Sequence, residues 1–137
     1  MNIIAERIIA YLKTNAALVA LLGSSNNIHI MGLDQREPKR IVISGDIGSD
    51  GNNIPSQTGD VEVQIVVSRE IASAPNVCLN IAQAVDDLLN KSEVELTSGS
   101  WKVISFIRQS SPGIQIDGKD NEYWLPLEYS FILDEST

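Results

Sequence analysis

The sequence predicts an α+β fold, with a mainly antiparallel sheet and two helices packed on one face of it. Two segments with apolar residues at three- and four-residue spacings predict the helices. Segments rich in β-branched residues, or alternating between apolar and polar residues, predict the strands. Because these strands come in runs joined by turns rather than alternating singly with helices, we expect antiparallel pairing.

The first predicted helix covers residues 3–22, with or without a kink in its middle. Apolar residues recur on one face, from Ile3 to Leu22, while charged residues occupy the opposite face. Asn15 is placed to cap a second short helix that begins at Ala16, and Gly23 is placed to stop it. We therefore expect a helical N-terminal segment that ends before a polar turn.

Three strands are expected next, separated by one long polar segment. The strands are predicted at Ile28–Met31, Arg40–Ser44 and Asp60–Arg69. The third is the clearest, because it alternates apolar and polar residues, with Val66 as the exception. Residues Gly45–Gly59 show no periodicity and predict a loop. Structureless loops beyond about 12 to 15 residues are uncommon in compact domains, so we expect this one to be functional or disordered.

The second half of the sequence predicts a core helix and three more strands. Pro75 suits the first position of the helix, which has a broad apolar face and about four turns. The final strand contains Pro126, which predicts a bulge or an edge position. A turn-rich connection precedes that strand at Ser110–Asp120. The three strands are expected at Val94–Thr97, Trp101–Gln109 and Glu122–Leu133, the first two as a hairpin.

Length and composition indicate one soluble domain, residues 1–137. A chain of 137 residues suits a single core, and 43% hydrophobic against 20% charged residues argues against disorder. Ten Lys and Arg against 18 Asp and Glu give a net charge of −8, which argues against direct nucleic-acid binding. Six acidic residues lie from Asp117 onward, against Lys119 alone, and predict one acidic edge of the sheet.

Residue types suited to catalysis or metal binding are scarce. Cys78 and His29 are the only cysteine and histidine, which excludes a disulfide within the chain and a multi-cysteine zinc site. Cys78 falls on the apolar face of the predicted helix, where a structural thiol is expected. We therefore expect no enzymatic activity, no cofactor and no metal.

Two glycine-rich segments resemble ligand-binding loops without meeting their requirements. Gly113–Lys119 has the spacing of a phosphate-binding loop, but Asp120 stands where Ser or Thr is required, and a strand is expected next instead of a helix. The segment from Asp46 to Asn53 is rich in Asp and Asn, but it fails the spacing of a calcium-binding loop. We expect a turn and a solvated loop.

Two further groups of residues favour ordinary structural roles. The adjacent Asp86 and Asp87 are expected as two surface charges on the polar face of their helix. The aromatic side chains at predicted strand positions suit core and cross-strand packing better than stacking on bases or sugars: Trp101, Tyr123, Trp124 and Tyr129.

No targeting or membrane-spanning segment is predicted. Glu6, Arg7 and Lys13 interrupt the apolar N-terminal segment, and the apolar runs are too short to cross a membrane. We expect the protein in the cytoplasm of the cell that makes it.

Several segments, in their order along the chain, carry a resemblance to a known family: Ala17–Gly23, Ile28–Ile30, Ile41–Ser44, Val61–Ser68, Ile81–Val85, and Tyr123–Leu133 after Asp117–Gly118. In this order of elements the chain resembles the small tail completion, or tail terminator, proteins of long-tailed bacteriophages and prophages. The resemblance covers nearly the whole chain. Lys39–Arg40 stands where these proteins often carry a Pro-aromatic pair, so a related neck or minor structural protein is the alternative.

This resemblance implies a non-enzymatic ring protein. Similar subunits form a ring, usually hexameric, that caps the finished tail tube, stops its growth and offers a surface to the head connector. It implies the tail tube protein and the head connector protein as partners, and a place at the tail-head junction of a virion assembled in a bacterial cytoplasm. A closed ring needs a heterologous interface, which strand edges and long loops can supply. The candidate interface residues are Asp46, Asp50, Asn52, Ile54, Gln57, Gln115, Asp117 and Lys119.

Two other classes of function remain open. A ligand-binding or regulatory α+β module would stay a monomer or dimer and gain thermal stability from a small molecule. An enzyme would have to use His29, Cys78 or carboxylates gathered in a cleft.

Overall fold

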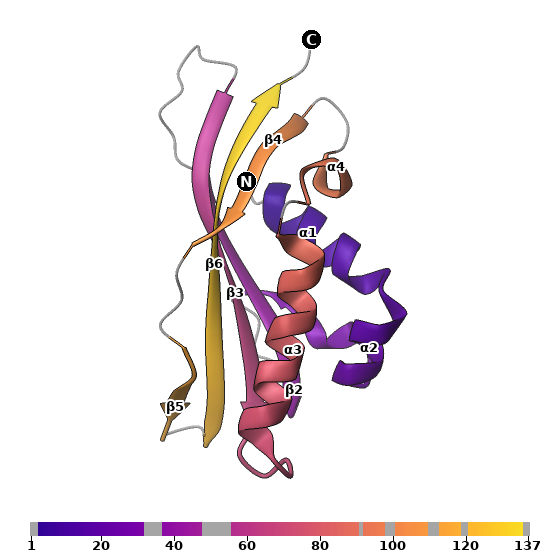
Figure 1. The fold of residues 1–137 in the computed structure, drawn as a ribbon, viewed down its shortest axis with the longest axis vertical. Helices are drawn as coiled ribbons and strands as arrows, with labels where there is room; N and C mark the ends of the chain where they lie inside the picture. The colour runs from indigo at the N-terminus through magenta and orange to yellow at the C-terminus, as the bar shows by residue number, and fades with distance from the viewer. Residues whose placement is uncertain are drawn as a thin grey trace.

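A computed structural model describes residues 3–31, 37–47, 56–90, 92–97, 101–109, 113–118 and 121–135. All its helices lie on one side of a tall sheet (Figure 1), so the predicted α+β fold is confirmed. In chain order the elements are α1 (Ile3–Lys13), α2 (Ala16–Leu22), a 3-10 turn η1 (Ser25–Asn27), β1 (Ile28–Ile30), β2 (Lys39–Ile47), β3 (Ser56–Ser68), α3 (Ala74–Leu89), α4 (Glu93–Leu96), β4 (Trp101–Arg108), β5 (Gln115–Asp117) and β6 (Glu122–Glu135).

The sheet has six strands within the described residues, in the order β1-β2-β3-β6-β4, with β5 also paired to β6. Every pair is antiparallel except β1 with β2. Along one edge of β6, β4 lies opposite residues 129–135 and β5 lies opposite residues 122–124. The two strands are therefore two parts of one interrupted outer strand, and β6 is central.

Pro126 lies at the interruption between β4 and β5. The carbonyl oxygen of Glu128 accepts a bond from the amide of Gln109, so the backbone polar groups of Glu128 point toward the β4 side of β6. The backbone of Pro126, two residues earlier, points the same way. Neither β4 nor β5 has a described residue in register with Pro126. The predicted edge strand is therefore wrong, because β6 is central in the sheet; Pro126 lies where neither β4 nor β5 pairs with β6 among the described residues, and its missing amide breaks no bond there.

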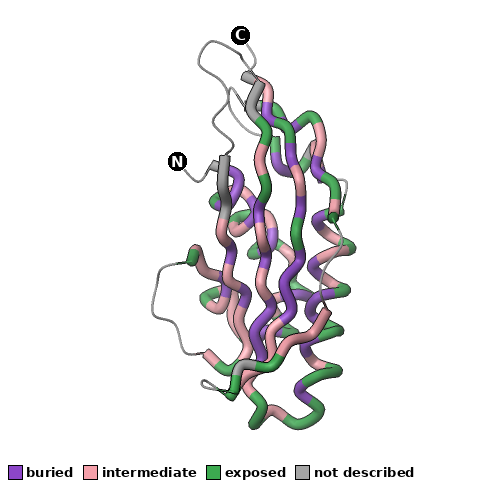
Figure 2. The backbone as a smooth tube through the Cα atoms, turned by 90° about the vertical axis from the view of Figure 1, so that its left-hand side faces the viewer, coloured by how far each residue is buried: buried purple, intermediate pink, exposed green. Residues whose placement is uncertain are grey.

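The core lies between the helices and the inner face of the sheet. Along β3 and β6 the buried residues alternate with more exposed ones except at Val66 and Pro126, which are buried as well, and the colours in Figure 2 follow this pattern. At the centre of this core the rings of Phe106 and Tyr129 stack with their centroids 4.9 Å apart. Helices α1 and α3 cover the inner face with Ile4, Ile8, Leu12, Cys78, Ile81, Val85 and Leu89.

The N-terminal helix is divided in two at the predicted position. The Asn15 side chain accepts a hydrogen bond from the amide of Leu18 at 2.9 Å, which satisfies one free donor of the first turn of α2. Gly23 ends α2 in the left-handed region, with φ of 93°, and its amide bonds to the carbonyl of Val19. The kink is therefore a capped junction between two helices.

The segment predicted as the strand Val94–Thr97 is instead the short helix α4. Its backbone closes helical bonds from the amide of Leu96 to Ser92 and from the amide of Thr97 to Glu93. Leu96 is fully buried in the core. The hairpin prediction was wrong because Val94 and Leu96 have the two-residue spacing of a strand, and one helical turn is too short to show a helical period.

The two ends of the predicted loop Gly45–Gly59 are strand instead. β2 continues to Ile47 and β3 begins at Ser56, with Asp46 opposite Asp60 and Ile47 opposite Gly59. The polar composition was misleading, because these strand ends pair through the backbone. The centre of the segment, residues 48–55, lies outside the described residues. Similarly, the predicted connection Ser110–Asp120 contains β5.

Candidate interaction surface

The face of the sheet turned away from the helices carries no helix among the described residues (Figure 1). We call this surface the open face. The strand register assigns to it every second residue of the strands, of which Val66 and Pro126 are buried and the others half-buried or exposed: Thr58, Asp60, Glu62, Gln64 and Val66 of β3, Trp124, Pro126, Glu128, Ser130 and Ile132 of β6, and Ser105 and Ile107 of β4.

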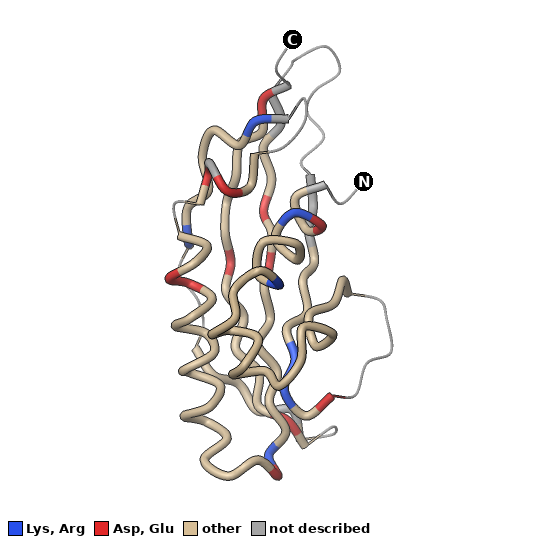
Figure 3. The backbone as a smooth tube through the Cα atoms, turned by 90° about the vertical axis from the view of Figure 1, so that its right-hand side faces the viewer, with Lys and Arg blue, Asp and Glu red and all other residues tan. Residues whose placement is uncertain are grey.

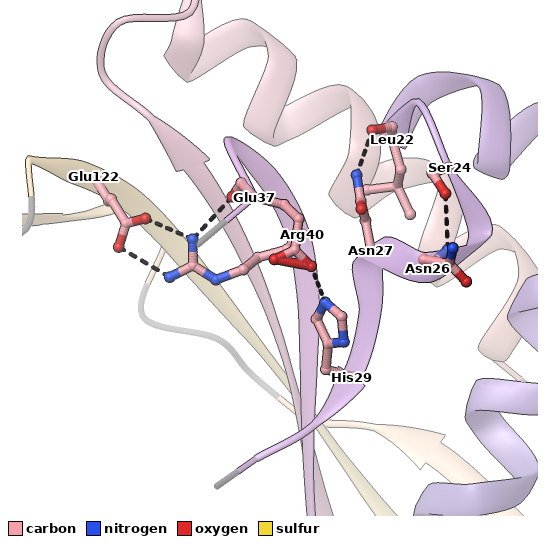
Figure 4. Close-up of polar contacts among 8 residues, drawn as sticks. All are labelled: Leu22, Ser24, Asn26, Asn27, His29, Glu37, Arg40 and Glu122. Carbon is pink, nitrogen blue, oxygen red and sulfur yellow. Dashed lines mark hydrogen bonds and ion pairs between the residues drawn. The ribbon is translucent and has the colours of Figure 1, made fainter. Parts of the chain in front are cut away.

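At the end of the open face near β5, side chains of the sheet cover one another and leave little apolar surface exposed. Val66, the exception to the alternation of β3, lies opposite Arg40 of β2 and Trp124 of β6 and is only 6% exposed. Arg40 donates two hydrogen bonds to the carboxylate of Glu122, at 2.6 and 3.1 Å (Figure 4). This bidentate pair crosses β3, so it explains why Val66 is apolar on the outer face.

The other half of the open face contains a shallow groove of about 440 Å³. Two isoleucines there are exposed, Ile107 at 51% and Ile132 at 37%. The groove is lined by Thr58, Gly59, Asp60, Ser105, Ile107, Gln109, Ser130, Phe131 and Ile132. It is an apolar depression with polar walls, of a kind that suits a protein side chain.

Three carboxylates lie beside this groove. Glu62 and Glu128 are directly opposite one another across β3 and β6, and Asp60 is one row further along. The Ser130 hydroxyl donates to Asp60 at 2.7 Å, and the Gln64 amide donates to Glu62. Within the described part of the chain, none of the three forms an ion pair. Figure 3 shows acidic residues at intervals along the chain and basic residues at a few separate places.

The predicted interface residues do not form one site. Asp46 and Gln57 belong to the upper ends of β2 and β3, where they lie opposite Asp60 and Leu133. Gln115 and Asp117 lie in β5, at the opposite end of the sheet (Figure 1). The remaining candidates lie outside the described residues: Asp50, Asn52, Ile54 and Lys119.

The predicted acidic edge of the sheet is wrong in its placement. β6, which carries most of those acids, lies between β3 and β4 and is not an edge strand. Glu128 therefore lies on the open face, and Glu122 is paired with Arg40. The alternation of β3 predicted one polar face, but only the pairing of β3 with β6 shows that Glu62 and Glu128 are opposite one another.

Asp86 is not the surface charge that its position suggested. The Tyr129 hydroxyl donates to its carboxylate at 2.7 Å, and Arg108 of β4 pairs with it at 3.1 Å. Burial, and then the hydrogen bond and charge of Asp86, raise the pKa of Tyr129 far above its ordinary value. Asp87 remains exposed and accepts a bond from Gln83. The aromatic Tyr129 is in the core, as predicted.

Cys78 and His29, the two side chains considered for catalysis, are both engaged in contacts within the fold. Cys78 is fully buried in α3, where its thiol lies 3.8 Å from the carbonyl of Ile65. Burial raises the pKa of this thiol to about 11, which disfavours the reactive thiolate. His29 of β1 pairs with Glu37 through its Nε2 atom (Figure 4).

Within the ranges that the structure describes, no three His, Cys, Asp or Glu side chains are grouped so that they could hold a metal ion. In the same ranges no helix has the length and apolar character needed to cross a bilayer. The glycine-rich segment around Gly113 is followed by β6, as predicted, and so lacks the helix on which phosphate binding depends.

No protein-family model matches the chain, and no curated protein matches it in sequence. Among solved structures, the fold is similar to a chain from the virion of a native gene transfer agent particle. The TM-score is 0.74, the sequence identity 13%, and the similarity covers 95% of this chain and 93% of the other. At 13% identity, this similarity shows a shared fold and nothing more.

Proposed function

We propose that this chain is a structural protein of a phage-like virion, and that within the virion it is a tail terminator. In this role a ring of subunits, six in the expected form, caps the tail tube, ends its growth and joins it to the head. Its partners are then the tail tube protein and the head connector protein, at the tail-head junction. The protein performs no catalysis and uses no cofactor.

The observation that carries this proposal is the fold similarity to a virion chain over nearly the full length of both proteins, at a TM-score of 0.74. Unrelated functions share folds, so the similarity supports the proposal together with the order of elements and not by itself. The surroundings of Cys78 and His29, which suit structural roles, are consistent with a protein that acts by assembly.

The sheet offers two outer edges to a neighbouring subunit, and they differ. On β4, side chains from α4 and the residue after it already occupy two amides: Thr97 accepts from Val103 at 2.9 Å and Glu93 from Phe106 at 3.4 Å. On β2, the pairing with β1 ends at Ile43, so residues 44–47 have no strand on their outer side among the described residues. We therefore expect the ring contact to use the β2 edge, which includes Asp46.

Deleting the gene from the phage or prophage that encodes the chain tests the proposed role. A terminator that stops tube growth predicts abnormally long tails without heads, which electron microscopy measures directly. Purified protein added to finished tubes should form a terminal ring, and light scattering of the protein over a range of concentrations reports any ring formed in solution. Tails of normal length that fail only to join heads would instead identify a neck protein, and normal virions would overturn both roles.

A further inference from the structure

Exposed apolar side chains on the open face form one patch. Ile107 lies opposite Ser130 and Ile132 lies opposite Ser105, so the two isoleucines are diagonal neighbours on adjacent strands. Both border the groove of about 440 Å³. An open face of an antiparallel sheet is ordinarily polar, because nothing but water covers it. This patch is therefore better explained by a partner than by the fold of the isolated chain.

The carboxylates around the patch have no ion-pair partner among the described residues. Like charges directly opposite one another on neighbouring strands destabilise a sheet, and Glu62 and Glu128 are such a pair. Asp60 adds a third carboxylate in the next row, and no Lys or Arg of the described residues pairs with any of them. A partner surface with positive charge would relieve this repulsion on binding.

The outer edge of β4, next to this patch, is poorly suited to pairing with a strand of the partner. Glu93 of α4 and Thr97, which follows α4, occupy the amides of Phe106 and Val103 on β4. β4 also carries a register shift between Val103 and Ser105. Both features obstruct the addition of a strand there. A partner that approaches this side of the molecule therefore docks on the face of the sheet.

We propose that the open face around Ile107, Ile132, Glu62 and Glu128 docks a second virion protein whose contact surface carries apolar side chains flanked by lysine or arginine. The identification of the partner as a virion protein rests on the proposed function. Nucleic acid and anionic membranes are repelled by the carboxylates, and a second copy of a chain with net charge −8 has the wrong sign to relieve them.

Head-tail joining in vitro tests this surface. Heads and tail tubes are prepared from a phage that lacks the gene, the purified protein is added back, and the tubes joined to heads are counted by electron microscopy at low and high salt. The wild type should restore joining, with a yield that falls as salt screens the contact. The variant E62Q/E128Q should restore it at least about tenfold less well at limiting protein, because two favourable charges are lost.

Two matched controls isolate the surface from net charge and from apolar exposure. E6Q/E70Q makes the same change in net charge at exposed residues elsewhere, and should join heads and tails as the wild type does. Ile107→Ser should reduce joining, whereas Ile116→Ser, at an isoleucine of β5 that is 60% exposed, should not. Circular dichroism of each variant checks that the protein is folded.

The outcomes separate this inference from the proposed function. If the wild type restores joining and E62Q/E128Q and Ile107→Ser restore it equally, the open face is not the docking surface and the inference is overturned. If both variants instead change the mass of the protein alone by light scattering, the occupant is a second copy, which also overturns it. If the wild type restores nothing, the proposed function fails, and this inference fails with it.

Discussion

Tyr129 ties the helix layer to the sheet through a polar bond inside the core. It is fully buried and stacks on Phe106, and its hydroxyl donates to Asp86 of α3 at 2.7 Å. Because burial and Asp86 raise its pKa, the hydroxyl keeps its proton and remains a donor. Arg108 holds the other oxygen of Asp86. Asp86 of α3 therefore contacts both Tyr129 of β6 and Arg108 of β4, and links the three elements.

Tyr129→Phe should destabilise the protein by about 1 to 2 kcal/mol, because it removes one hydrogen bond to a charged group and leaves the ring in place. Urea unfolding measures the loss. Tyr123→Phe is the matched control: Tyr123 is partly buried and its ring contacts Arg69, and the change leaves that ring intact. Equal stability of both variants would mean that the bond from Tyr129 to Asp86 contributes nothing net.

Cys78 should make the protein less stable at high pH. Burial raises the pKa of its thiol from 9.0 to about 11, so between these values the unfolded chain releases a proton that the folded chain keeps. Stability therefore falls as the pH rises through this window, by about 2 to 3 kcal/mol in total.

Tyrosines also titrate in this range, so the test compares the wild type with Cys78→Ala. Urea unfolding at pH 8 and at pH 10.5 should show a smaller decrease for the variant, although its stability at pH 8 is lower because a buried atom is lost. Parallel decreases in the two proteins would show that the thiol does not titrate differently on folding.

At the scale of elements, α4 acts as a cover for the outer edge of β4. A helix of four residues has little stability of its own, and Leu96 fixes it to the core. From that position Thr97 and Glu93 reach the amides of Val103 and Phe106. An edge strand that would otherwise show free amides to other chains is thereby closed.

Thr97→Val should expose this edge, because valine keeps the shape of threonine and removes its hydroxyl. We expect a loss of about 1 kcal/mol and faster hydrogen exchange at the amide of Val103, measured by NMR. Thr14→Val is the control, since the Thr14 hydroxyl bonds only to the carbonyl of Tyr11 at the exposed end of α1. Unchanged exchange at Val103 would contradict the role given to α4.

The predictions from sequence succeeded where the signal is local and periodic. The apolar face of α3, the cap at Asn15 and the alternation of β3 each depend on a few neighbouring residues. They failed where pairing decides the structure: β2 and β3 extend into a polar segment, and α4 forms only because Leu96 reaches the core. Local patterns do not contain these long-range contacts.

The candidate surface was harder to predict than the fold for the same reason. Glu62 and Glu128 are far apart in the sequence, and Ile107 and Ile132 lie on different strands; only the register brings each pair together. The sequence showed an excess of acids near the C-terminus, which predicted an acidic edge. Since β6 is central, Glu128 lies on the open face instead and Glu122 pairs with Arg40.

Considered as a whole, the molecule combines a net charge of −8 with a sheet that has one protected face and one open face. The carboxylates on the open face raise the free energy of the isolated fold, and salt lowers that penalty by screening. Stability and docking therefore place opposite demands on the same residues, a conflict typical of functional surfaces.

This conflict predicts that E62Q/E128Q is more stable than the wild type in low salt, with a melting temperature higher by about 2 °C, because the opposed charges are removed. Raising NaCl from about 10 mM to about 0.5 M shortens the screening length, so the wild type should gain stability and the difference from the variant should shrink. Calorimetry over this range measures both effects. The control E6Q/E70Q removes the same two negative charges without touching the opposed pair, and its melting temperature should rise less in low salt. If the two double variants behave alike, the repulsion belongs to the overall charge of the molecule and Glu62 and Glu128 impose no local strain on the sheet.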